Sequence, residues 1–599
     1  MVCLKTLASY KTDPVALAED SESARRLFTT LVDVGAGTSE GDYAGKDVDG
    51  KIVLASAQPG AVQDLAVGKF GAVGIVSYAQ NQKTAWSGEN LDAVRWGHLE
   101  TFSTNKTFGF MVSLRTARAL QERLAKREEI LVGFDVKAGQ HPGHYEVVTA
   151  TILGADEKLR NEEIAFSCHL DHQRPGANDN ASGCATILEV ARTLQKLISE
   201  GKLARPARTI RFIFPPEIEG TMALLNGKWA RFEPIPYKDE RTGIYSTVSP
   251  PVPEADSPVL LSGADLARRI KAVVHMDMVG GGPETKAVFH VTRGPMSLPS
   301  FVQDVAWAFA EWVNEETYEF AATGKAAYPL VSAEGGKEPL RAEYSAYTMG
   351  SDHDVYQDSS FGIPAIYLND WPDRFIHTNL DSATNIDATK LKQVGFIGAA
   401  SGYYLASSPS GFPLKEVNRG QLFRSIEVDG RLSEVREADA AALKREFLER
   451  ENGILESLPH TSDSQIAWGE QKFQTILPLR IINSEKFEAK PATGDGSVKF
   501  KRKAEPKGPM AVFGYDYFGA ELAKRGHTTR PKLLEYEGLW GGGEEYAYEG
   551  LNFADGKRNA QEIRDAVSAE YGPVPVEMVV EYLKALEKIG VLEKSEVKK

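Results

Sequence analysis

A chain of 599 residues is too long for a single hydrophobic core, so we expect roughly three or four domains. Its composition, with 42% hydrophobic and 25% charged residues, is that of an ordinary folded protein and argues against a disordered chain. The formal net charge of −14 argues against a nucleic-acid partner for the whole chain. Because no apolar run reaches roughly 18 residues, we expect no membrane span.

The amino-terminal sequence and the cysteines bear on the compartment. The start, MVCLKTLASYKTD, lacks an apolar stretch followed by a cleavage site, although a chain whose leader had been removed would look the same. The three cysteines, Cys3, Cys168 and Cys184, are too few for a disulfide framework, which favours a reducing compartment. We therefore expect a cytoplasmic protein.

The first 140 residues contain strand-like segments flanked by glycine, but no cluster of titratable residues. Strands are predicted over 51–55, 72–76 and 110–114, and the last runs into a predicted helix over 116–127. We expect residues 1–37 to form an N-terminal segment and residues 38–140 to form a structural or lid domain.

From residue 141 to 408, predicted strands and helices alternate. The strands cover 164–167, 209–214, 272–275 and 365–368, and the helices cover 185–200, 298–313 and 391–405. This order predicts an α/β domain, with a mixed central sheet and helices on both faces.

The composition shifts after the segment SSPSGFP at 407–413, so we expect a separate C-terminal α+β region over 409–599. Helices are predicted over 438–450, 561–570 and 576–589, and the last carries one apolar stripe. A winged-helix-like arrangement fits the two final helices. Between Asp555 and Lys599, however, eight Lys or Arg face nine Asp or Glu, so we expect no nucleic-acid binding.

Metal-type ligands gather at the ends of the predicted central strands. Eight of the eleven histidines lie between His141 and His377. Two imidazoles with several carboxylates suit a borderline cation such as Zn²⁺. Five short stretches carry these groups: HLD from His169, ANDNASG from Ala177, PEIEG from Pro216, HMDMVG from His275, and IHT from Ile376.

This ordered set of motifs resembles the M28 zinc aminopeptidases over roughly Tyr145 to Ser408. The resemblance implies a zinc exopeptidase-like fold that binds one or two zinc ions. It implies that His169, Asp277 and His377 are zinc ligands and that Asp179 bridges two ions. It also implies that the peptide bond after Asp179 is cis and that Asp171 orients the His169 ring.

The glutamates depart from the pattern of the family, which has an adjacent pair: a general base followed by a zinc ligand. Counting back from Gly220, Glu217 falls on the base position, but Ile218 occupies the ligand position. We predict Glu217 as the base, and Glu219 as a replacement ligand. A branch of the family with a non-adjacent or single glutamate and a winged-helix-like C-terminal region fits this chain better than the secreted enzymes do.

Other polar residues of the central domain have more than one interpretation. The pair Asp352-His353 is either a loop pair bonded to backbone or a pair that supports the ligands or faces substrate. We interpret His172 and His275 as ordinary polar residues near the site. In the N-terminal part, the runs DVDGKIVLA and KFGAVGIV resemble a protease-associated (PA) domain, which would border the substrate cleft.

The resemblance implies a metallo-aminopeptidase acting on peptides, with Glu217 as the proton carrier for a zinc-activated water. Two alternatives stay open, because a fold does not fix a reaction. One is acyl transfer of the glutaminyl-cyclase kind, and the other is an inactive relative used as a receptor or scaffold. The sequence leaves side-chain preference, the number of zinc ions and the oligomeric state open.

Overall fold

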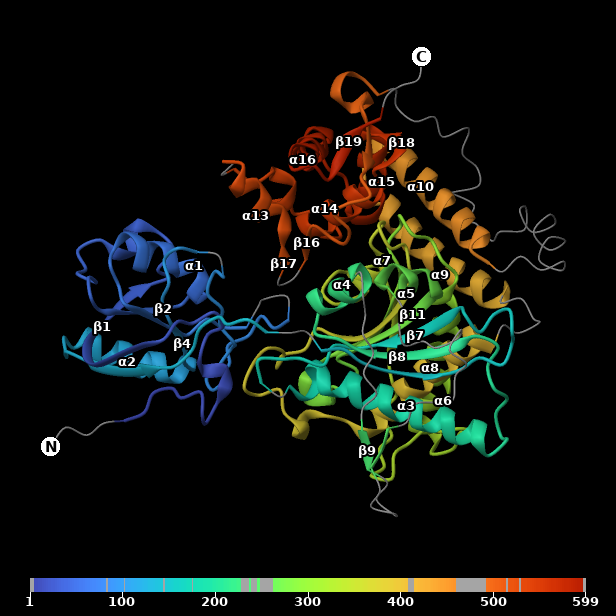
Figure 1. Ribbon diagram of the computed structural model, residues 1–599, viewed down its shortest axis with the longest axis horizontal. Helices are drawn as coiled ribbons and strands as arrows, with labels where there is room; N and C mark the ends of the chain where they lie inside the picture. Colours follow the sequence, from blue (N-terminus) through green and yellow to red (C-terminus); the bar gives the residue numbers. More distant parts are fainter. Residues whose placement is uncertain are drawn as a thin grey trace.

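The structure is a computed structural model. It describes residues 5–81, 85–101, 103–143, 146–174, 176–227, 236–238, 245–247, 262–407, 414–458, 492–512, 515–526 and 529–595. Figure 1 shows an N-terminal unit to one side of a central sheet covered by helices, with the last part of the chain above that sheet.

The N-terminal unit is built around a five-stranded sheet in the order β4-β3-β2-β1-β5. Its strands are β1 (Ala24–Gly35), β2 (Ile52–Ala55), β3 (Gly74–Ser77), β4 (Gly109–Met111) and β5 (Leu131–Val136), and its helices are α1 (Pro59–Gln63) and α2 (Leu114–Ala125). Because β1 pairs with both β2 and β5, the expected boundary between residues 37 and 38 falls inside this unit. Its likeness to a PA domain stays a prediction.

The central domain contains a seven-stranded sheet in the order β13-β12-β14-β11-β7-β8-β6. Strands β8, β7, β11 and β14 are parallel neighbours, whereas β6 and β12 are antiparallel to β8 and β14. The strands are β6 (Val148–Ile152), β7 (Glu163–Ser167), β8 (Thr209–Phe214), β11 (Ile270–Asp277), β12 (Val288–Thr292), β13 (Ala342–Ser345) and β14 (Ala365–Trp371).

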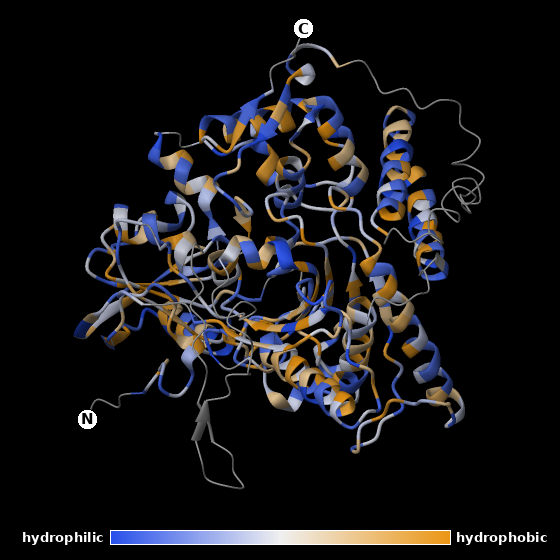
Figure 2. Cartoon of the chain, turned by 45° about the vertical axis from the view of Figure 1, so that its right-hand side comes forward, coloured by the Kyte–Doolittle hydropathy of each residue, from blue (hydrophilic) through white to orange (hydrophobic). Residues whose placement is uncertain are grey.

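Helices cover both faces of this sheet because its central strands are apolar on both sides. Phe166 of β7 packs in the core with α3 (Gly183–Ser199), α6 (Val302–Thr323) and α8 (Ala388–Ser407), whereas the adjacent Ala165 packs in a second core. That second core includes α4 (Glu219–Asn226), α5 (Gly263–Arg269) and α7 (His353–Gln357). Hydrophobic residues accordingly line the sheet in Figure 2. The predicted mixed α/β class is confirmed.

The C-terminal part consists of two long helices followed by a small α+β region. Helix α9 (Leu414–Leu432) packs against both α6 and α10 (Glu437–Glu456). Arg424 of α9 donates to Asp304 of α6 and to Glu451 of α10. The remaining elements are β15 (Lys499–Arg502), β16 (Ala511–Val512), β17 (Tyr515–Asp516), α13 (Tyr517–Lys524), α14 (Gly543–Asn552), β18 (Asp555–Asn559), α15 (Ala560–Tyr571), α16 (Val576–Lys588) and β19 (Leu592–Lys594). A winged-helix-like role for this region stays a prediction.

A short strand pair, β9 (Pro236–Lys238) with β10 (Tyr245–Thr247), completes the described elements. Among the helices that the structure describes, none is both long and apolar enough to cross a bilayer.

Candidate metal centre

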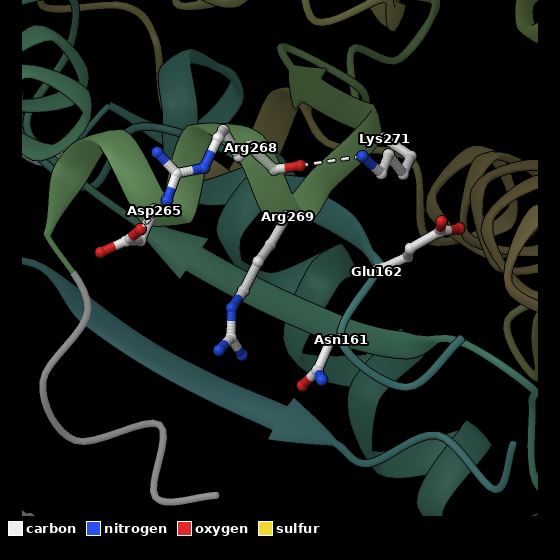
Figure 3. A pocket seen from close by; sticks show the side chains of 6 residues that line it. All are labelled: Asn161, Glu162, Asp265, Arg268, Arg269 and Lys271. Carbon is white, nitrogen blue, oxygen red and sulfur yellow. Dashed lines mark hydrogen bonds and ion pairs between the residues drawn. The ribbon is translucent and has the colours of Figure 1, made fainter. Parts of the chain in front are cut away.

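The predicted ligands meet beyond the carboxyl ends of the parallel strands. His169 follows β7, Asp277 ends β11, and His377 lies in the loop after β14. The amino ends of β7 and β11 border a different hollow of about 430 Å³, shown in Figure 3. That hollow is lined by Asn161, Glu162, Asp265, Arg268, Arg269 and Lys271, so it lies at the other end of these strands and has no imidazole.

The first group of ligand atoms consists of His169, Asp179 and Asp277. Nε2 of His169 lies 3.2 Å from Oδ1 of Asp179 and 3.3 Å from Oδ1 of Asp277. Nδ1 of His169 donates to the carbonyl oxygen of Asp171 at 3.0 Å, which leaves Nε2 free to present its lone pair to a cation. All three side chains are buried. This set of one nitrogen and two carboxylates suits zinc.

The second group shares Asp179 and adds two imidazoles. Oδ2 of Asp179 lies 3.1 Å from Nε2 of His377 and 3.4 Å from Nε2 of His172. In each group the ligand atoms lie within 4.8 Å of one another. The two oxygens of one buried carboxylate therefore face two separate groups of imidazoles, which is the arrangement of a carboxylate that bridges two cations.

The carboxylates and imidazoles of the centre shift one another's pKa values. Burial lowers the pKa of His169, but the neighbouring Glu217 and Asp277 carboxylates raise it more, so that the net shift is well above the ordinary value. Burial raises the pKa of Glu217, His169 lowers it in part, and Asp277 and Asp179 raise it further, so that the net shift is well above the ordinary value. A divalent cation would supply the positive charge that these clustered carboxylates favour.

The loop NDNASG attaches itself to the end of β11. The side-chain oxygen of Asn180 accepts from the N–H groups of Gly183 and Met278, and that of Asn178 accepts from the N–H of Gly280. Ser182 is the N-cap residue of α3, but its hydroxyl donates to the Asn178 carbonyl and accepts from Val279 instead of capping the helix. The predicted cis peptide between Asp179 and Asn180 is confirmed.

Asp381 fixes the backbone of the same loop from outside the two groups. Its carboxylate accepts from the N–H of Asn178 at 2.8 Å and from the N–H of Asp179 at 3.0 Å. Sequence reasoning missed this residue. Its position four residues after His377 was the only available signal, and that spacing alone specifies no contact.

Glu217 lies next to the first group on the turn after β8. Its N–H donates to Oδ1 of Asp171 at 2.7 Å, and its charge interacts with His169, Asp277 and Asp179. The Asp171 carboxylate lies 3.8 Å from Nδ1 of His169, so the ring is oriented by the Asp171 carbonyl and the carboxylate holds the Glu217 turn.

The two residues after Glu217 have different surroundings. Ile218 has a positive φ of 54° and a side chain that is 1% exposed in the apolar core. Such a φ is rare for a β-branched residue, and the Asp352 carboxylate stabilises it by accepting from the Ile218 N–H at 2.7 Å. Glu219 begins α4, and among the described residues it belongs to neither ligand group.

Asp352 and His353 lie behind the centre. Burial raises the pKa of Asp352 to about 7. His353 is fully buried, stacks on Tyr367 with ring centroids 3.9 Å apart, and lies 2.8 Å from the Thr348 carbonyl. It is therefore part of the packed core and is bonded to the backbone. His275 is buried too and bonds to the Ser351 hydroxyl.

The N-terminal unit reaches the second group through Trp96. Its ring stacks on His377 with centroids 3.7 Å apart and on His172 at 5.2 Å. The backbone N–H of Trp96 donates to the His377 carbonyl at 2.8 Å. Sequence reasoning missed both Trp96 and the participation of His172. The spacing His169-x-x-His172 on a single loop was the available signal for the latter.

Comparisons with known proteins give the following. Residues 147–217 and 257–401 match the profile of peptidase family M28. An aminopeptidase from Aneurinibacillus sp. strain AM-1 aligns at 21% identity and a TM-score of 0.36, covering 66% of this chain and 78% of that one. BSAP, a zinc aminopeptidase from Bacillus subtilis, aligns at 18% identity with a TM-score of 0.41, and the alignment covers 66% of this chain and 80% of that one. Glutaminyl cyclase from Porphyromonas gingivalis aligns at 16% identity with a TM-score of 0.24, and the alignment covers 43% of this chain and 76% of that one. A comparison with curated protein sequences gave no match.

Proposed function

The chain carries a domain of peptidase family M28, and on this premise we propose that it is a zinc-dependent aminopeptidase, which removes N-terminal residues from peptides. The observation that carries the proposal is the bridging position of Asp179, whose two oxygens face His169 on one side and His377 on the other. Zinc held by His169, Asp179 and Asp277 would supply a Lewis acid that polarises the scissile carbonyl and lowers the pKa of water.

Glu217 is the proton carrier in this proposal. Its carboxylate accepts a proton from the attacking water and returns it to the nitrogen of the leaving peptide. The hydrogen bond from its N–H to Asp171 fixes the turn on which it lies. Burial and the neighbouring carboxylates raise its pKa, which favours a group that can hold a proton and give it back.

An aminopeptidase also needs a group that selects a free α-ammonium. We assign this role to Glu19 of the N-terminal unit. Glu19 lies on the segment beside Trp96, since its N–H donates to the Gly97 carbonyl at 2.8 Å and its carbonyl accepts from Leu99. Its side chain is solvent-accessible, and its charge interacts with those of His172 and Asp171. Desolvation, followed by repulsion from Asp20, raises its pKa to about 7. A bound ammonium would offset both effects.

One panel tests the proposal. Purified protein would be given aminoacyl-4-nitroanilides, their N-acetylated counterparts and a peptide with N-terminal glutamine, before and after chelation. We expect hydrolysis of the free-amine anilides alone, loss of this activity with chelator, and its return with zinc. Activity that persists without any bound metal would contradict the metal assignment. Cyclisation of the glutamine peptide without anilide hydrolysis would establish the acyl-transfer alternative instead.

A further inference from the structure

His172 lies beside the Asp179 carboxylate and against the Trp96 ring. Its ring is mostly buried, with a side chain 9% exposed, and Nδ1 bonds to the Arg174 carbonyl at 2.7 Å. Since a carbonyl oxygen only accepts, Nδ1 carries the proton and Nε2 presents its lone pair. This Nε2 pairs with Oδ2 of Asp179 at 3.4 Å and has no closer polar partner among the described residues.

In the family's adjacent glutamate pair, the second glutamate is a zinc ligand. His172 lies where a ligand of that kind would be expected. Ile218 stands at the expected ligand position, with its side chain in the apolar core among residues such as Ile213 and Met222. Glu219 belongs to neither group of ligand atoms among the described residues. His172, by contrast, shares with Asp179 and His377 a cluster whose ligand atoms all lie within 4.8 Å.

We propose that His172 takes the place of the missing glutamate ligand and completes, with Asp179 and His377, the second of the two cation sites that share Asp179. This proposal rests on the proposed function for the class of metal. The second site has two neutral imidazoles and a shared carboxylate, so it should favour zinc-class cations over oxygen-seeking ions such as Mg²⁺ or Ca²⁺. The first site has two carboxylates, so it should discriminate less between zinc-class cations and Mg²⁺ or Ca²⁺.

The Trp96 ring is the positioning group of the second site. The ring lies against both imidazoles of that site, and the backbone N–H of Trp96 donates to the His377 carbonyl. The carbonyl of Gly97, the next residue, accepts from the side-chain amide of Gln173, beside His172, at 3.2 Å. The N-terminal unit therefore contacts the second site directly.

Metal stoichiometry tests the inference. The full chain, stripped of metal by chelation and dialysis, would be titrated with zinc by calorimetry, and the bound metal counted by elemental analysis. We expect two equivalents for the wild type. His172→Ala and His172→Gln should each retain one equivalent with unchanged affinity, while the affinity for the other falls at least about 100-fold. His172→Asp should restore part of the affinity for the second zinc equivalent, because a carboxylate can also bind zinc.

His141→Ala is the matched control, since His141 is an exposed histidine on a loop outside both groups, and it should keep two equivalents. Cobalt titration gives an independent readout, because loss of one imidazole ligand should change the visible absorption of the second bound ion alone. Two equivalents of unchanged affinity in His172→Ala, or a single equivalent in saturated wild type, would overturn the inference. The aminopeptidase proposal would survive either result, since it depends on hydrolysis by the wild type and its loss on chelation.

Discussion

The Asp171 carboxylate accepts a hydrogen bond from the N–H of Glu217 at 2.7 Å, while the Asp171 carbonyl accepts one from the His169 ring at 3.0 Å. One residue thus links the turn that carries Glu217, the proposed proton carrier, to His169, a proposed metal ligand. Because the Asp171 side chain is 55% exposed, its removal should not disturb the core.

Asp171→Ala should lower kcat by about 10- to 100-fold, because the Glu217 turn loses its acceptor, while the zinc content stays near that of the wild type. Asp171→Asn retains an oxygen that can accept the same hydrogen bond and should keep most of the activity. Steady-state kinetics with elemental analysis check this pair of variants. Equal activity in wild type and Asp171→Ala would show that the turn does not need this bond.

Glu19→Gln tests the assignment of the amine-binding group. If Glu19 binds the α-ammonium, the variant should raise KM for aminoacyl-anilides by about 10-fold or more, since a charged hydrogen bond contributes about 1.5–3 kcal/mol. Zinc content and thermal stability should not change. The control is Glu22→Gln, three residues further along the same segment, which should behave as wild type. An unchanged KM in Glu19→Gln would remove Glu19 from the site.

Trp96→Leu tests how much the stacking of Trp96 on His377 and His172 contributes to zinc affinity, without removing any proposed ligand. Leucine cannot stack on His377 and His172, so the affinity for the second zinc equivalent should fall by about 10-fold, and that for the first should change less. The matched control is Trp86→Leu, because Trp86 lies over Arg374 and not over the ligands. Zinc titration of both variants gives the comparison. Equal loss of both equivalents in Trp96→Leu would indicate general unfolding.

Glu427 joins α9 to the central domain and makes stability dependent on pH. Desolvation opposes ionisation, but pairing with Arg293 and Arg431 prevails and lowers the pKa of Glu427 to about 2, from an ordinary 4.5. The folded state therefore gains stability above pH 4.5 and loses it as the pH falls toward 2. Such a shift corresponds to at most about 3 kcal/mol.

Glu427→Gln should accordingly lower the unfolding temperature at neutral pH, and its difference from wild type should shrink below pH 4.5. Calorimetric scans at several pH values measure this. Glu315→Gln is the control, because its pairing with Arg419 is exposed and should contribute little. A difference that stays constant down to pH 3 would show that the charge of Glu427 is not responsible.

Most of the sheet and several ligands could be predicted from the sequence, because they depend on local patterns. The strand at β7 appears as a short apolar run, and His169 follows it directly. The role of His172 could not be predicted, because it depends on which ring nitrogen the Arg174 carbonyl engages. Nor could the contact of Trp96 with His377, which lies 281 positions away along the chain and is brought close only by packing between two units.

The positive φ of Ile218 belongs to the same class of unpredictable features. Nothing in the letters PEIEG indicates that the isoleucine side chain turns into the core while Glu217 faces the ligands. The hydrogen bond from the Ile218 N–H to the buried Asp352 carboxylate stabilises this conformation of the turn, and Asp352 is 134 positions away along the chain. The sequence therefore led to Glu219 as the replacement ligand, whereas among the described residues Glu219 belongs to neither group of ligand atoms.

The most direct test of the central claim is kcat and zinc content measured together on Glu217→Gln. Glutamine keeps the shape of the side chain but cannot take the proton of the attacking water. The account predicts a fall in kcat of at least about 10²-fold, with zinc content and KM near those of the wild type. Near-full activity in Glu217→Gln, with zinc still bound, would contradict it.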